Sequence, residues 1–168
     1  MAIIQDYAAR MQRAADKKWL IMRFLRDEIY TTLGVISLLI GVDERGTRAT
    51  IAALEKEGLV KRHSVSVYES LPPVVVVGVT AHGQAMAYDI ESEKMVEKVF
   101  EVGRFSRQNL QHTIDMHRLK VGAESAGLVK KWVNGDRLKT LTAKVKRPDA
   151  IALTQHDQRV AIEVERTI

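Results

Sequence analysis

Three carboxylates near the end of the chain have the residue types and spacing of a cation-binding site. Asp149 opens one apolar run, and Glu163 and Glu165 lie in a second run that follows a polar turn at 154–158. Because side chains alternate between the two faces of a strand, Glu163 and Glu165 are predicted to point the same way. Acids that converge at a sheet edge repel one another unless a cation lies between them, and hard divalent cations prefer oxygen ligands. The pattern predicts a Mg²⁺ or Mn²⁺ site that cleaves phosphodiesters.

A β-hairpin must position these acids. The predicted strands are 147–153 and 159–165, both rich in Ile, Val, Leu and Ala, with the polar turn between them. An alternative interpretation is a surface hairpin whose glutamates are solvated and have no chemical role.

The residues around the acids resemble a nuclease family. Pro148-Asp149 followed by Glu163-Val164-Glu165 looks like the PD-(D/E)xK motif of restriction-endonuclease-like nucleases, with Glu165 where lysine is commoner. The longer phrase, 146–149 and then 161–167, resembles the MobC-type relaxases, also grouped as plasmid replication-relaxation proteins. The expected fold class is then α+β: an N-terminal winged helix-turn-helix followed by a restriction-endonuclease-like α/β domain.

The resemblance also implies an activity. Asp149 and Glu163 would bind the metal, and Glu165 would be a further ligand or the base for the attacking water. The reaction would nick one strand of double-stranded DNA at a plasmid origin of transfer or replication. Single-stranded DNA and relaxosome or coupling proteins are further expected partners. Such a nuclease core normally continues with another helix and strand beyond residue 168, so an abbreviated domain, or part of a longer protein, is expected.

Residues 16–90 resemble winged-helix DNA-binding domains. Helices are predicted from Asp16 to residue 29, from residue 31 or 32 to Gly41, and from a cap at Thr47 to Gly58. Strands at 59–67 and 74–79 and a helix opening at 80–83 follow. In such folds the third helix enters the major groove and the wing touches the DNA backbone. The expected DNA contacts are Arg45, Thr47, Arg48, Lys61 and Arg62. An alternative role for this domain is protein docking or dimerisation, because residues 16–90 as a whole carry little net charge.

The remaining segments complete the predicted layout. Residues 1–15 form an N-terminal arm, 91–104 a connector helix that suits a homodimer, and 105–168 the nuclease-like domain. A helix is expected over 105–123. It carries His112 and Asp115, which lie three residues apart and form an accessory metal ligand or proton-transfer pair, or an exposed hydrogen bond.

The net charge of +5 is concentrated in one segment. Residues 104–147 carry 11 Lys and Arg against 3 Asp and Glu, directly before the acidic hairpin. A basic segment beside an acidic centre suits a nuclease, because phosphates must be attracted while the metal is held. Lys144, Lys146 and Arg147 are the expected phosphate contacts.

Composition excludes several classes of protein. The chain has no cysteine, so disulfides and thiolate zinc sites are excluded. No apolar run approaches the roughly 20 residues of a membrane span, and the N-terminus lacks the basic region of a signal peptide. We expect a cytoplasmic protein that does not interact with membranes. Two other functions fit the sequence: a non-catalytic winged-helix regulator that binds promoters or origins, and a relaxosome adaptor.

Overall fold

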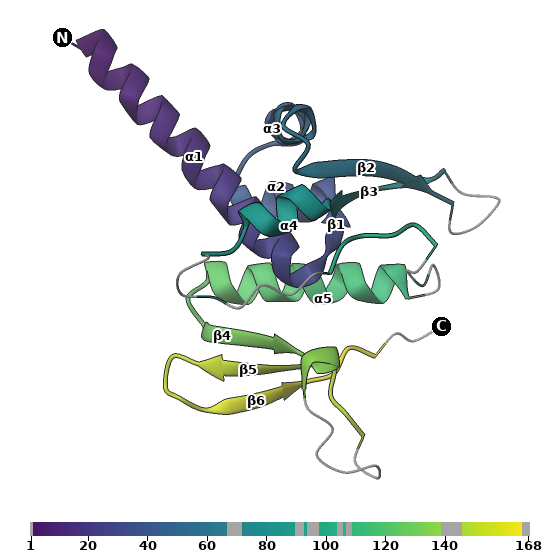
Figure 1. The fold of residues 1–168 in the computed structure, drawn as a ribbon. Helices are drawn as coiled ribbons and strands as arrows, with labels where there is room; N and C mark the ends of the chain where they lie inside the picture. Colours follow the sequence, from purple (N-terminus) through teal and green to yellow (C-terminus); the bar gives the residue numbers. More distant parts are fainter. Residues whose placement is uncertain are drawn as a thin grey trace. The chain divides into compact units, whose positions relative to one another are not determined.

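The structure is a computed structural model that describes residues 2–66, 72–89, 93, 98–103, 106, 109–138 and 146–165. These residues form a mixed α+β fold with two three-stranded antiparallel sheets, which confirms the expected class at this level (Figure 1). The chain divides into two compact units, Met1–Gln108 (unit 1) and Asn109–Ile168 (unit 2). In the part of the chain described, no helix has both the length and the apolar composition to cross a membrane.

Unit 1 begins with one long helix, α1 (Ala2–Glu28). The predicted helix start at Asp16 is wrong, because the helix runs through this residue without a break. The Asp16 carboxylate instead accepts a hydrogen bond from Gln12 Nε2 one turn earlier, at 2.8 Å. The C-terminal part of α1 contributes Ile21 and Leu25 to the core, whereas residues 6–16 are exposed.

Two further helices, α2 (Leu33–Ile40) and α3 (Glu44–Lys56), follow. The predicted end of α2 at Gly41 is confirmed, since Gly41 has the left-handed φ of 62° that glycine tolerates at a helix end. The predicted cap of α3 at Thr47 is wrong. The Asp43 carboxylate accepts the Gly46 N–H at 2.8 Å and caps the helix.

The first sheet has the strand order β1–β3–β2, from β1 (Tyr30–Thr32), β2 (Val60–Val65) and β3 (Val74–Val79). The hairpin of β2 and β3 was predicted. β1 was not predicted: residues 30–32 are expected to close the first helix and cap the second, whereas they form a strand in which Thr31 pairs with Val77. The next helix, α4 (Ala81–Met86), starts where predicted, with the Thr80 hydroxyl accepting the Gly83 N–H at 3.0 Å.

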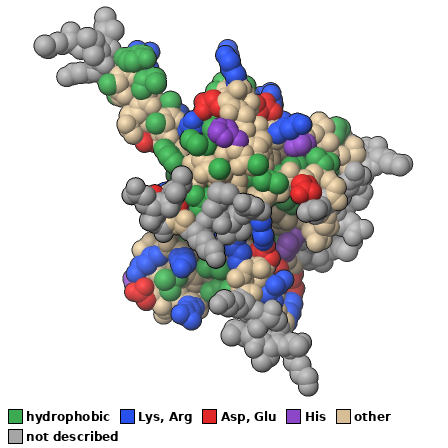
Figure 2. Space-filling view, in the orientation of Figure 1, with side chains coloured by type: hydrophobic (Ala, Val, Ile, Leu, Met, Phe, Trp, Pro, Cys, Tyr) green, Lys and Arg blue, Asp and Glu red, His purple; other side chains and the backbone are tan. Residues whose placement is uncertain are grey.

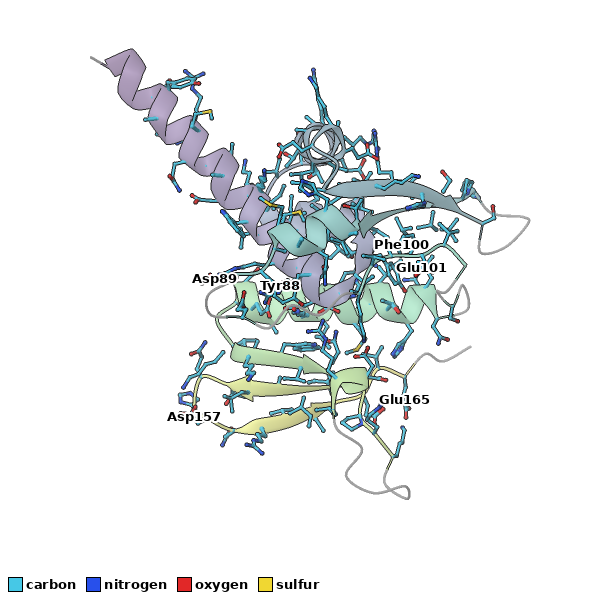
Figure 3. All side chains as sticks on the ribbon, viewed as in Figure 1. Tyr88, Asp89, Phe100, Glu101, Asp157 and Glu165 are labelled. Carbon is cyan, nitrogen blue, oxygen red and sulfur yellow. The ribbon has the colours of Figure 1, made fainter. Side chains whose placement is uncertain are left out.

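Phe100 covers part of this sheet. Its ring centroid lies 5.2 Å from that of Tyr30 and 4.9 Å from that of His63. Gly78 on β3 leaves room for the ring, since a Cβ there would overlap it. Figure 3 labels Phe100 next to the sheet. Residues 98–103 are not helical, which corrects that end of the predicted connector helix; most of its other residues lie outside those described.

Unit 2 contains one α-helix, α5 (Leu110–Ser125), and a sheet of order β4–β5–β6 within its described residues. The strands are β4 (Val129–Asn134), β5 (Ala150–Thr154) and β6 (Arg159–Ile162), with a 3-10 turn, η1 (Gly135–Arg137), after β4. The predicted hairpin of β5 and β6 is confirmed. The predicted second strand is too long by three residues, because β6 ends at Ile162.

Candidate cation site and nucleic-acid interface

Asp149 and Glu163 lie next to the last register pair of the β5–β6 hairpin, with Asp149 just before β5 and Glu163 just after β6. That pair is Ala150 and Ile162, so continuing the register by one residue would place Asp149 opposite Glu163. The Val164 N–H donates to Asp149 Oδ2 at 2.8 Å, a side-chain bond that replaces the next backbone bond of the ladder. Two of the three predicted acids therefore share the open end of the hairpin. Figure 3 shows Glu165 at this end and Asp157 at the turn end.

Asp149 also approaches a histidine on α5. His112 Nε2 lies 3.3 Å from Asp149 Oδ1, and the two side chains are 33% and 27% exposed. The prediction grouped His112 with Asp115. The Asp115 carboxylate instead accepts from Gln111 Nε2 at 2.9 Å and lies 3.7 Å from Arg118 Nη1. The fold thus brings His112 to the catalytic candidate itself, which sequence spacing alone did not indicate.

Gly135, which was not among the predicted site residues, holds the backbone of this site. Its N–H donates to the Asp149 carbonyl oxygen at 2.7 Å. A Cβ at Gly135 would overlap the Pro148 carbonyl oxygen. A change of rotamer cannot relieve this overlap, because the oxygen is a backbone atom. The Asn134-Gly135 pair is a turn signal in the sequence, but it does not indicate the close approach to Pro148.

The second acid has a basic neighbour. Lys146 Nζ lies 3.2 Å from Glu163 Oε2, on side chains that are 77% and 39% exposed. Glu165 is exposed, as is Arg147, and Lys144 lies outside the described residues. No group of three or more His, Asp or Glu side chains in the described ranges is arranged for a metal. Two carboxylates still suit Mg²⁺, which proteins commonly bind through one or two carboxylates together with substrate phosphates.

In unit 1, the predicted DNA contacts on α3 divide into exposed and buried residues. Arg45 and Arg48 are exposed, and Arg48 Nη2 is 2.8 Å from the Glu44 carboxylate one turn earlier. Thr47 is fully buried and its hydroxyl donates to the Val42 carbonyl oxygen at 3.3 Å, so its assignment as an exposed contact is wrong. The reason is periodicity: Thr47 shares the inward face of α3 with Ile51. Basic and acidic side chains lie together over α3 (Figure 2).

Lys61 and Arg62 on β2 are both exposed, and as neighbours in a strand they point to opposite faces of the sheet. Arg62 makes two hydrogen bonds to Glu55 of α3, from its backbone N–H at 2.8 Å and from Nε at 2.7 Å. The side-chain hydrogen bond from Arg62 is the main cause of a Glu55 pKa below its usual value, and the same bond raises the Arg62 pKa. His63 has a lowered pKa, first because it is partly buried and second because of the Lys61 charge.

Comparisons with known proteins identify no relative. A scan against protein-family models found no match, and searches of curated proteins and of solved structures found no significant match. Support for a function therefore comes from the arrangement of these residues and from the motif resemblance.

Proposed function

We propose that the chain is a plasmid mobilisation or replication relaxase. In this proposal unit 1 binds double-stranded DNA in the cytoplasm, and unit 2 is a cation-dependent endonuclease that nicks one strand at an origin of transfer or replication. The observation that carries it is the position of Asp149 and Glu163, which lie next to the same register pair at the open end of the β5–β6 hairpin.

The element order of unit 1 supports DNA binding. A helix, a short strand, two helices and a hairpin follow one another, and the three strands form one sheet of order β1–β3–β2. This is the order of a winged helix, in which the third helix enters the major groove and the hairpin contacts phosphates. Arg45 and Arg48 on α3 and Lys61 and Arg62 on β2 are the exposed basic residues in the corresponding positions.

In unit 2, Asp149 and Glu163 would hold Mg²⁺ or Mn²⁺. The bound cation would supply Lewis-acid polarisation of the scissile phosphate. His112 orients the Asp149 carboxylate through the 3.3 Å contact, and the Val164 N–H fixes the second oxygen. Lys146, 3.2 Å from Glu163, is placed to attract a phosphate to the site. Glu165 remains the candidate base or additional ligand.

Plasmid nicking tests the proposal. Supercoiled plasmid carrying the cognate origin is incubated with Mn²⁺ or Mg²⁺ and the wild-type chain, Asp149→Asn or Glu163→Gln. We expect both variants and EDTA to abolish nicking, while binding to origin duplex by fluorescence anisotropy stays unchanged. Asp157→Asn, at the turn end of the hairpin and paired with Lys130 at 3.0 Å, is the matched control and should nick normally. Nicking by both site variants at wild-type rates would exclude Asp149 and Glu163 as residues required for cleavage.

A second function is a non-catalytic DNA-binding regulator or a relaxosome adaptor. The observation that favours it is that Asp149 and Glu163 each already lie next to a basic side chain, His112 and Lys146. A regulator would bind the origin and be indifferent to EDTA and to both acid substitutions. An adaptor would in addition keep its DNA affinity after Arg45→Ala and Arg48→Ala, because α3 would then contact a protein.

A further inference from the structure

Among the described residues of unit 2, the outer edge of β6 has no partner strand. The other edge of β6 pairs with β5. Arg159, Val160 and Ala161 are all exposed, and Val160 keeps 41% of its surface in contact with solvent. An exposed strand edge with an apolar side chain is a template for pairing with another strand.

The register shows which backbone groups point outward. Thr154 and Gln158 extend the β5–β6 register by one residue, and the Thr154 N–H donates to the Gln158 carbonyl oxygen at 2.9 Å. Backbone bonds alternate along an antiparallel strand, so Gln158, Val160 and Ile162 face β5. The Val164 N–H, which bonds to Asp149, continues this alternation. The N–H and C=O groups of Arg159, Ala161 and Glu163 therefore face away from β5.

This outward edge is complementary to itself. Antiparallel pairing of two β6 strands about Ala161 places Arg159 of each copy directly opposite Glu163 of the other. The same register places Val160 opposite Ile162. Directly opposed residues lie on the same face of a sheet, so the dimer gains two charge pairs on one face and two apolar pairs on the other.

We propose that two copies of this chain associate through β6, in antiparallel register centred on Ala161, to form one continuous sheet. The partner strand is β6 of a second copy, because Arg159 precedes Glu163 by four positions. When the same strand runs in the opposite direction, each Arg159 lies opposite a Glu163. A partner of unrelated sequence would need this charge order by chance. The proposal concerns assembly and does not depend on nicking.

Charge reversal with rescue tests the register. Arg159→Glu places two acids opposite each other in both symmetric pairs, so the dimer dissociation constant by sedimentation equilibrium should rise by about tenfold or more. The double variant Arg159→Glu with Glu163→Arg restores opposite charges and should regain the wild-type constant. Lys131→Glu, an exposed reversal on β4, is the control. A monomeric wild type, or a dimer that Arg159→Glu leaves intact, would overturn the proposal.

Amide hydrogen exchange gives a second readout. In the dimer, the N–H groups of Arg159, Ala161 and Glu163 should be protected and should lose protection on dilution, whereas those of Val160 and Ile162 stay protected. Ala161→Pro removes an outward donor, which edge strands tolerate, and should dissociate the dimer while the hairpin persists. Ala161→Ser keeps the donor and should dimerise. Protection confined to Val160 and Ile162 at every concentration would contradict pairing through this edge.

Discussion

His112 Nε2 and Asp149 Oδ1 lie 3.3 Å apart, and the other oxygen of the same carboxylate accepts the Val164 N–H at 2.8 Å. One side chain thus joins α5, the entrance to β5 and the segment after β6. A carboxylate fixed at both oxygens has a defined orientation, which is what a cation site requires of its ligands.

Replacing His112 tests this orientation. Loss of such a supporting partner weakens metal affinity, and we expect His112→Ala to lower Mn²⁺ affinity about tenfold in calorimetric titration. His156→Ala, in the exposed turn of the hairpin, is the matched control and should bind Mn²⁺ like the wild type. Equal affinities for His112→Ala and the wild type would show that the histidine is a neighbour without influence on the ligand.

Gly135→Ala should disturb the site from the backbone. The added Cβ overlaps the Pro148 carbonyl oxygen, so the strand entrance must move, at a cost of about 1–3 kcal/mol in the free energy of unfolding. Thermal and urea unfolding measure the change. Gly122→Ala is the control, because its Cβ meets nothing within 4 Å on α5 and alanine favours a helix by about 0.5–1 kcal/mol. A Gly135→Ala protein as stable as the wild type would show that Gly135 does not lie so close to the Pro148 carbonyl oxygen.

The Glu55–Arg62 pair predicts a stability change at acidic pH. Because the Glu55 pKa is lowered in the folded protein, the pair stabilises the fold above the unfolded value of about 4.3 and is lost as pH falls through the folded value. Glu55→Gln should lower the free energy of unfolding by about 0.5–1 kcal/mol at pH 7, since Arg62 is partly exposed. In denaturant unfolding, the difference between the two proteins should shrink as the pH falls below the unfolded value, and a difference that stays constant would exclude the ion pair as its cause.

His63 predicts a second pH dependence, nearer neutrality. Its pKa is lowered by burial and then by Lys61, so the unfolded chain binds its proton more readily. Stability is therefore full above the unfolded pKa of about 6.5 and falls as pH drops below it. His63→Leu should flatten the melting temperature between about pH 7.5 and 5.5, and Lys61→Gln should reduce the slope in part. If the melting temperature of His63→Leu depends on pH as steeply as that of the wild type, a group other than His63 causes the dependence.

Local signals predicted much of the fold. Gly41 and Gly58, both with positive φ, correctly predict the ends of two helices, and the polar turn at 154–158 correctly predicts the hairpin. These features depend on residues close in sequence. The start of α3 was misplaced because Asp43 and Thr47 are both good caps, and only Asp43 makes the bond.

Features that depend on distant residues were not predictable. β1 is three residues long and exists because β3 pairs with it. The contact between His112 and Asp149 requires α5 to reach the entrance of β5, and the sequence does not encode that approach in any spacing. The end of β6 at Ile162 follows from the Asp149 side chain, which takes the N–H that a longer ladder would have used.

The hydrogen bonds between Arg62 and Glu55 also have a consequence for the proposed DNA complex. A phosphate that takes the Arg62 side chain removes the principal interaction that lowers the Glu55 pKa. The carboxylate is then left next to negative charge, which raises its pKa further. In that proposed complex, DNA binding would be coupled to proton uptake by Glu55, and the complex would strengthen as the pH falls toward the ordinary pKa of a glutamate.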